Sequence, residues 1–216
     1  MSVLNVFVTL ALLVFALTGV VWAVRIFIGN LGSVFDAWDA VVSWNRWALG
    51  WTSGRIPLDS GLYPQLIPAN WSITYVLIGN TTIQAFAKGI MPLFAVFILL
   101  SLFDLGLETR SFGFFIGGIF AQLLLKKFLA PEITSGYVDV AVAFFGLLAI
   151  HALIKAGNTK DASRSDQFLL FGAIFAAGAS ITKQPGIYIF ALYPIMAYVN
   201  VVRHHDPKLK KNLKRY

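Results

Sequence analysis

Four polar residues recur at helical spacing in an aromatic segment that follows the first apolar stretch. Asp36, Asp39, Ser43 and Arg46 are three, four and three positions apart, which on a helix gives one polar stripe. Carboxylates near a bilayer are costly to keep, so one interpretation is that the stripe faces a cavity that holds a substrate. The other is an interfacial helix with a solvated face, capped by Ser33 and with Asp36 in a capping-box position.

Two further charges lie at the edges of apolar segments. Asp139 begins such a segment, where it either holds a substrate or complements the helix dipole. Lys183 lies in the turn Thr-Lys-Gln-Pro-Gly, directly before the last apolar segment. A lysine beside the amides of a helix N-terminus can bind an anion such as a lipid phosphate. A lysine that extends along apolar surface to reach water is the alternative.

The elements that position these charges must lie in a membrane. Of the 216 residues, 58% are hydrophobic and only 12% are charged, whereas a soluble domain is about a quarter charged. Much of the net charge of +7 lies in residues 203–216. Because this run follows an apolar segment, it favours cytoplasmic anchoring over nucleic-acid binding. The absence of cysteine excludes disulfides and thiolate metal sites.

Six apolar segments predict an all-α integral membrane fold with about six transmembrane helices, since about 20 residues suffice for a span. They cover residues 6–28, 89–105, 112–129, 138–154, 167–181 and 186–202. The transmembrane module is therefore residues 1–205, and residues 206–216 form a basic cytoplasmic tail. The connection between the first two spans, residues 30–88, contains the amphipathic helix.

The distribution of lysine and arginine predicts the orientation. With the N-terminus in the cytoplasm, ten of the 17 Lys and Arg residues lie on the cytoplasmic side. Most of these are in the short loop 155–166 and the tail, where the positive-inside rule is most reliable. Residues 30–88 and the turns 130–139 and 182–186 then share the opposite face, which is periplasmic or lumenal. The unusual polar residues therefore gather on one face.

The motifs on that face together resemble the GT-C superfamily of membrane glycosyltransferases. The likeness is to its protein O-mannosyltransferase-like and lipid A aminoarabinose-transferase-like families, including bacterial family 39. FDAWDAVVSWNRWA at 35–48 resembles the acidic helix that these families have after their first span. YPQL at 63–66 resembles their Tyr-Pro segment before the second span. Asp139, followed by Phe144 and Phe145, resembles the acid that these families carry at the start of a later span, before aromatic residues. The turn at 182–186 is also similar to bacterial members.

The resemblance implies transfer of a sugar from a polyprenyl-phosphate donor to a hydroxyl acceptor on the periplasmic or lumenal face, in bacteria at the inner membrane. Asp39 would be the general base for the acceptor hydroxyl, and Asp36, one helical turn away, is the competing candidate. Cations would balance the donor phosphate as its bond to the sugar breaks. The residues implied in donor-phosphate or substrate binding are Arg46, Lys183, Tyr63, Gln65, Gln184 and Asp139.

A divalent cation, Mg²⁺ or Mn²⁺, stays open as a cofactor, and Asp139 would bind it if one is used. Zinc is not expected, because the chain has no cysteine and His151, His204 and His205 lie on or near the cytoplasmic side. The partners that the resemblance implies are a polyprenyl-phosphate-linked sugar and membrane lipid, without nucleic acid. Nothing in the sequence predicts the oligomeric state.

Two departures from the family pattern keep rival functions open. Ala40 follows Asp39, whereas the family motif is usually an Asp-Glu pair. Family members also usually have more than six spans, often followed by a soluble domain. The shorter chain favours an N-terminal fragment or a non-catalytic truncated relative. A transporter or flippase of lipid-linked sugars is a further interpretation. It would use the same cations to hold its substrate but would need no general base.

Overall fold

The computed structural model describes residues 3–205, and within this range the chain forms helices and no strand. The long helices are α1 (Val3–Asn30), α4 (Ala85–Thr109), α5 (Phe112–Lys127), α7 (Asp139–Asn158), α8 (Ala162–Ser180) and α9 (Gly186–His205). The short elements are η1 (Ala40–Asn45), α2 (Arg46–Thr52), η2 (Leu58–Ser60), α3 (Leu66–Ile78) and α6 (Ala130–Ser135). The all-α prediction is confirmed for these residues. The basic tail, residues 206–216, lies outside them.

Three helices are long and apolar enough to cross a membrane. They are α4 with 25 residues, α7 with 20, and the stretch Thr9–Asn30 of α1 with 22. At about 1.5 Å per residue they extend roughly 30–38 Å, which matches a hydrocarbon core about 30 Å thick. Membrane crossing by α5, α8 and α9 stays a prediction. Helix α5 has only 16 residues, and α8 begins with a polar first turn.

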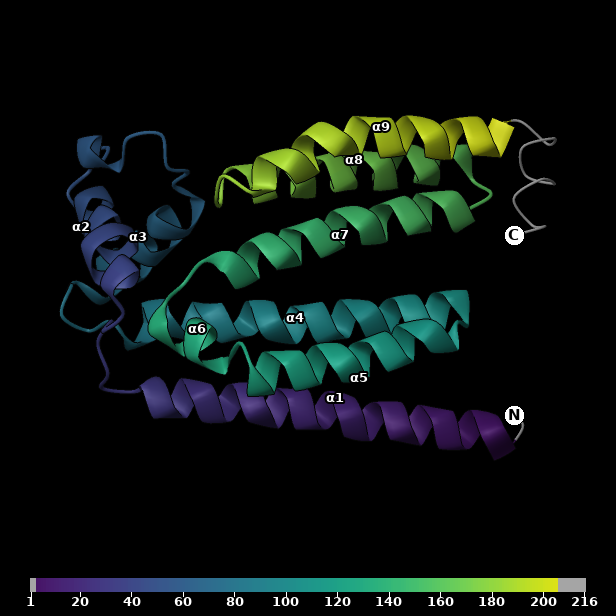
Figure 1. Cartoon of the computed structure of the whole chain (residues 1–216), viewed down its shortest axis with the longest axis horizontal. Helices are drawn as coiled ribbons and strands as arrows, with labels where there is room; N and C mark the ends of the chain where they lie inside the picture. The colour runs from purple at the N-terminus through teal and green to yellow at the C-terminus, as the bar shows by residue number, and fades with distance from the viewer. Residues whose placement is uncertain (1–2, 206–216) are drawn as a thin grey trace.

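The six long helices lie side by side in two groups (Figure 1). Helices α1, α4 and α5 form one group and α7, α8 and α9 form the other, and the main contact between the groups is that of α4 with α7. Phe94 and Phe97 of α4 meet Phe144 of α7 with ring centroids 5.4 and 6.0 Å apart. Such ring pairs stabilise an interface beyond the area they bury, so this one helix pair joins the two groups.

Small residues let α8 and α9 approach closely. The hydroxyl of Tyr193 in α9 donates a hydrogen bond of 2.7 Å to the carbonyl oxygen of Leu169 in α8. A Cβ atom on Gly172 would lie 2.0 Å from that hydroxyl. Only glycine leaves room for the tyrosine, which is buried between the two helices. The second group is thereby fixed as a tight hairpin beside α7.

Residues 31–84, which connect α1 to α4, fold into a helical cap at one end of the bundle (Figure 1, left). The turn between α8 and α9 and the short helix α6 lie at this same end, here called the cap end. The cap has its own core, in which the ring of Phe35 stacks on the fully buried Trp71 with centroids 4.5 Å apart. The three segments predicted to share a face therefore share one end of the molecule.

The start of the acidic helix differs from the prediction. Residues 33–36 are not helical, and the helical segment begins at Trp38. Ser33 does not cap it, because its hydroxyl donates to the carbonyl oxygen of Asn30 at the end of α1. The backbone is held extended by tertiary contacts, since the Phe35 amide donates to Gln84 Oε1 at 2.7 Å. Asp36 therefore lies before the helix and is not part of a continuous polar stripe.

Candidate functional site

Asp39 lies at the start of the helical segment of the cap and is exposed. Its side chain caps no backbone amide, and its carboxylate has no hydrogen-bond or ion-pair partner among the described residues. The π-helical turn η1 follows it directly, and its residues Ala40 and Trp44 are buried. A free, solvent-facing carboxylate is able to accept a proton from a ligand that binds beside it.

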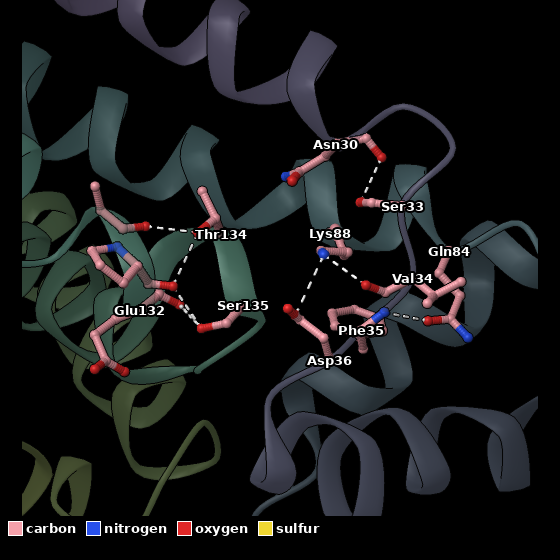
Figure 2. A network of polar contacts seen from close by, with 12 residues as sticks. Asn30, Ser33, Val34, Phe35, Asp36, Gln84, Lys88, Glu132, Thr134 and Ser135 are labelled. Carbon is pink, nitrogen blue, oxygen red and sulfur yellow. Dashed lines mark hydrogen bonds and ion pairs between the residues drawn. The ribbon is translucent and has the colours of Figure 1, made fainter.

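Asp36 is tied instead to a buried lysine that the sequence analysis did not single out (Figure 2). The Nζ atom of Lys88 lies 3.9 Å from Asp36 Oδ1, donates a 2.8 Å hydrogen bond to the carbonyl oxygen of Val34, and stands over the ring of Phe35. The lysine side chain is 5% exposed and that of Asp36 is 79% exposed. Lys88 thus anchors the extended segment to α4, and its charge partly offsets that of Asp36.

Arg46, a predicted phosphate ligand, pairs with an acid from a later part of the cap. Its Nε atom lies 2.9 Å from Asp59 Oδ2, and the two side chains are 66% and 46% exposed. An exposed pair of this kind adds little stability, so the guanidinium can exchange its partner at small cost. Asp59 carried no sequence signal, because a single acid in a Pro-rich connection has no periodicity to mark it.

Tyr63 and Gln65 belong to an aromatic surface of the cap. The Tyr63 ring packs against Trp44 and Trp47 with centroids 5.9 and 5.5 Å apart. Gln65 accepts a 3.2 Å hydrogen bond from the indole of Trp51 and donates one of 3.0 Å to the carbonyl oxygen of Tyr63. Tyr63 is half-exposed, while Trp44 and Trp47 are buried. The segment therefore presents one aromatic face on a rigid base.

Tyr75 lies buried in the cap and is not a candidate for a catalytic acid. Its hydroxyl donates a hydrogen bond to Oδ1 of the buried Asn45. Burial raises the pKa of Tyr75 well above its ordinary value, because the phenolate would lose its hydration. The residue therefore stays protonated and serves to orient η1 against α3.

Asp139 and Lys183, which are far apart in the sequence, form a direct pair. The Nζ atom of Lys183 donates to both carboxylate oxygens of Asp139 at 2.8 Å. The lysine side chain is 25% exposed and that of Asp139 is 58% exposed. Lys183 is therefore neither a free phosphate ligand nor a lysine that merely reaches water. Gln184 lies next to it in the turn and is half-buried.

One backbone contact brings this turn to the cap. The amide of Leu66 donates a 3.0 Å hydrogen bond to the carbonyl oxygen of Ile181. This places the segment of Tyr63 and Gln65 next to the turn that carries Lys183. The structure thus brings the Tyr-Pro segment, the turn at 182–186 and Asp139 together, whereas neither Asp36 nor Asp39 forms an ion pair with Arg46 or Lys183.

A second charged cluster lies near the opposite end of the bundle, between α4 and α7. Lys155 Nζ is 2.9 Å from both Asp104 Oδ2 and Glu108 Oε2. His151 Nε2 is 2.9 Å from Asp104 Oδ2, but the two atoms do not have the geometry of a hydrogen bond. The donor atoms of Asp104, Glu108 and His151 lie within 4.8 Å of one another and could hold a metal ion, although the Lys155 ammonium already supplies a positive charge there.

The sequence analysis missed this cluster as a unit, although a signal was present. Asp104 and Glu108 are four residues apart, and so are His151 and Lys155. Residues at this spacing share a helix face, and ionisable pairs on the faces of two apolar helices predict that the faces meet. Asp104, Glu108 and His151 are the one group of three possible ligand side chains that lie so close together among the described residues, and the cap-end carboxylates of Asp36, Asp39 and Asp139 form no such group.

Comparison of the chain with protein-family models, with curated proteins and with solved structures finds no match in any of the three.

Proposed function

We propose that the chain is a glycosyltransferase with six membrane spans that moves a sugar from a polyprenyl-phosphate donor to a hydroxyl acceptor. The observation that carries the proposal is the meeting of distant polar segments at the cap end. The Lys183 ammonium donates hydrogen bonds to Asp139, and the Leu66 amide donates one to the carbonyl oxygen of Ile181, two residues before that lysine. Polar groups at the end of apolar helices suit a substrate with a charged head and a lipid tail.

In this proposal Asp39 is the general base. The acceptor oxygen forms a bond to the anomeric carbon as the bond from that carbon to the phosphate oxygen breaks. The acceptor proton moves to Asp39, and the lipid phosphate leaves with the bonding electrons. The free carboxylate supports this role, because it needs no partner exchange before it accepts the proton. Asp36 is the weaker candidate, since Lys88 already stands near it.

Arg46 and Lys183 would stabilise the leaving phosphate, whose negative charge grows in the transition state. Both cations are paired with exposed carboxylates, those of Asp59 and Asp139. A dianionic phosphate competes well for them, and the released Asp139 could then bind a hydroxyl of the sugar or a divalent cation, Mg²⁺ or Mn²⁺. Tyr63, Gln65 and Gln184 would contact the donor or the acceptor beside the turn.

The location follows from the same proposal. The cap end would face the periplasm, with the chain in the plasma membrane of a bacterium and both ends of the described chain towards the cytoplasm. The grouping of the polar segments at one end and of the described chain ends at the other supports an even number of spans (Figure 1). Helices α5, α8 and α9 would then be spans in addition to the three that are long and apolar enough.

The experiment is sugar transfer by membranes that contain the full chain, with a radiolabelled polyprenyl-phosphate sugar as donor. Asp39→Asn keeps the size of the side chain but cannot accept the proton, so transfer should fall by about 10²–10⁴-fold. Asp166→Asn is the matched control, because this exposed acid lies on α8 near the opposite end and should leave transfer unchanged. Transfer that survives Asp39→Asn at the wild-type rate would exclude Asp39 as the base.

A transporter of lipid-linked sugars is the second candidate, and the cluster of Asp104, Glu108, His151 and Lys155 favours it. Ionisable groups within membrane helices often mark the path of an ion or a substrate. A transporter would move the labelled lipid from one leaflet of a proteoliposome membrane to the other without releasing its sugar. Protection of the label from an added membrane-impermeant reagent, without transfer to any acceptor, would support this function over the first.

A further inference from the structure

Two cations meet where the end of α5 lies beside α1 (Figure 1). Lys126 is in the last turn of α5, and its Nζ atom donates a 3.4 Å hydrogen bond to the carbonyl oxygen of Thr18 in α1. The same Nζ atom stands 5.9 Å from the ring centroid of Trp22. Positions 18, 22 and 25 lie on one face of α1 because they recur at helical spacing, so Arg25 is the next side chain on the face that Lys126 touches.

This pair of cations has no acidic partner, unlike three lysines elsewhere in the molecule. Lys88, Lys155 and Lys183 each have a carboxylate oxygen within 3.9 Å. Arg25 and Lys126 form no ion pair with any described residue, and their like charges oppose each other. Because two adjacent cations beside apolar helices are costly without a counter-charge, an anion from outside the chain would stabilise this place.

The position along α1 identifies the surroundings of the pair. Residues 3–24 contain no charged residue, and at about 1.5 Å per residue they extend about 33 Å, close to the thickness of a hydrocarbon core. Arg25 follows this stretch directly, and Trp22 is of a type that prefers the boundary between hydrocarbon and headgroups. Val21 and Ile28, one helical turn to either side of Arg25, are exposed. The pair therefore lies at headgroup level, beside a face that acyl chains can cover.

Helix dipoles alone do not account for the pair. Lysines in the last turn of α5 complement the negative end of that helix, but Arg25 lies before the last turn of α1. A phosphate oxygen accepts strong hydrogen bonds from both arginine and lysine. A zwitterionic lipid would also bring an ammonium group, for which the described residues offer no acid within ion-pair distance of the pair. An anionic phospholipid brings the phosphate without that second charge.

We infer that Arg25 and Lys126 bind the phosphate of an anionic glycerophospholipid in the leaflet at the cap end, with its acyl chains along the exposed apolar face of α1. Phosphatidylglycerol has the required chemistry, since its headgroup carries one negative charge and no cation. The residues proposed to bind the sugar donor belong to the cap, to the start of α7 and to the turn between α8 and α9. The lipid site is therefore separate from the proposed reaction and does not depend on it.

The test first compares two lipids on the unchanged protein. The full chain is purified in detergent, and native mass spectrometry measures the retention of phosphatidylglycerol and of phosphatidylcholine with the same acyl chains. The wild type should retain phosphatidylglycerol more strongly, by about 5-fold for each cation that contributes. Equal retention of the two lipids would overturn the inference without any variant.

Variants then locate the preference. Arg25→Gln and Lys126→Gln should each reduce it by about 5-fold, whereas Arg25→Lys keeps the charge and should preserve it. Lys127→Gln is the matched control, because it removes the same charge from the next residue of α5, which contacts neither Thr18 nor Trp22. An equal loss in Lys127→Gln would show attraction by the overall charge of this end and would overturn the site.

Two competitors identify the source of the phosphate. Inorganic phosphate should leave the bound phosphatidylglycerol in place, because it has no acyl chains, and displacement by it would assign the site to a free anion. Complete displacement by an equimolar amount of decaprenyl phosphate would assign the site to the prenyl lipid, and either result would overturn the inference. Sugar transfer by the wild type is measured in the same preparation, and its absence would count against the glycosyltransferase proposal alone.

Discussion

The two ends of α7 carry charged residues that are arranged in opposite ways. At the cap end, Asp139 has one partner, Lys183, and more than half of its side chain is exposed. Near the other end, Lys155 is held by two carboxylates at once, and a third group, His151, adjoins one of them. The first arrangement is one ion pair between two residues, whereas the second is a network in which one cation is shared by two carboxylates.

The difference shows that ionisable residues in apolar helices have two uses. Removing Lys155 would leave two neighbouring carboxylates, those of Asp104 and Glu108, without their shared cation, so their mutual repulsion would add to the loss of both ion pairs. Removing one member of an exposed pair leaves a group that water can solvate. We therefore expect variants near the Lys155 end to change stability and variants at the cap end to change substrate handling.

The largest effect on stability is expected from Lys155→Met. It would leave Asp104 and Glu108 as neighbouring carboxylates without a cation, so unfolding should require about 1–3 kcal/mol less free energy. Unfolding in mixed detergent and SDS, followed by circular dichroism, measures the change. Lys155→Arg is the control, because it keeps the charge. A Met variant as stable as the wild type would show that the cluster is no more committed than the cap-end pair.

A smaller change in stability is expected from Lys183→Met, below about 1 kcal/mol, because Asp139 remains accessible to water. If Lys183 binds the donor phosphate, transfer should nevertheless fall by about 10²-fold, as it does when a donor to a developing anion is removed. The same unfolding experiment, combined with the transfer assay, checks both values. Loss of stability in step with loss of transfer would assign Lys183 a structural role instead.

The smallest effect on stability is expected from Asp59→Asn, within about 0.5 kcal/mol, because its pair with Arg46 is largely exposed. If Arg46 binds the donor phosphate, as proposed, its release from Asp59 should leave binding at least as strong as in the wild type, so the concentration of donor that gives half-maximal transfer should not rise. An increase in that concentration would mean that Asp59 orients the guanidinium for the substrate.

Much of the helical framework could be predicted from the sequence, because apolar runs bounded by Gly, Pro and charged residues mark long helices. The run at 112–129 corresponds to α5 within two residues, and the run at 186–202 begins where α9 begins. The start of the acidic helix could not be predicted in this way. Residues 33–36 have a helical pattern, but contacts with Gln84 and Lys88, which follow much later in the chain, hold them extended.

The candidate site shows the same division. Spacing identified Asp139 and Lys183 as residues at helix ends, but their pairing depends on the packing of α7 against α8 and α9, which periodicity does not encode. The free state of Asp39 and the pairing of Arg46 with Asp59 are likewise tertiary facts. By contrast, the second cluster was missed although the four-residue spacings in α4 and α7 carried a signal for it.

The hydrogen bond from Leu66 to Ile181 has a consequence for the order of biosynthesis. The cap is translated directly after α1, but the carbonyl that receives the Leu66 amide belongs to the turn after α8. The first amide of α3 therefore cannot be paired in this way until the hairpin of α8 and α9 has formed. The polar surface at the cap end is therefore complete only after the last two helices of the bundle have folded.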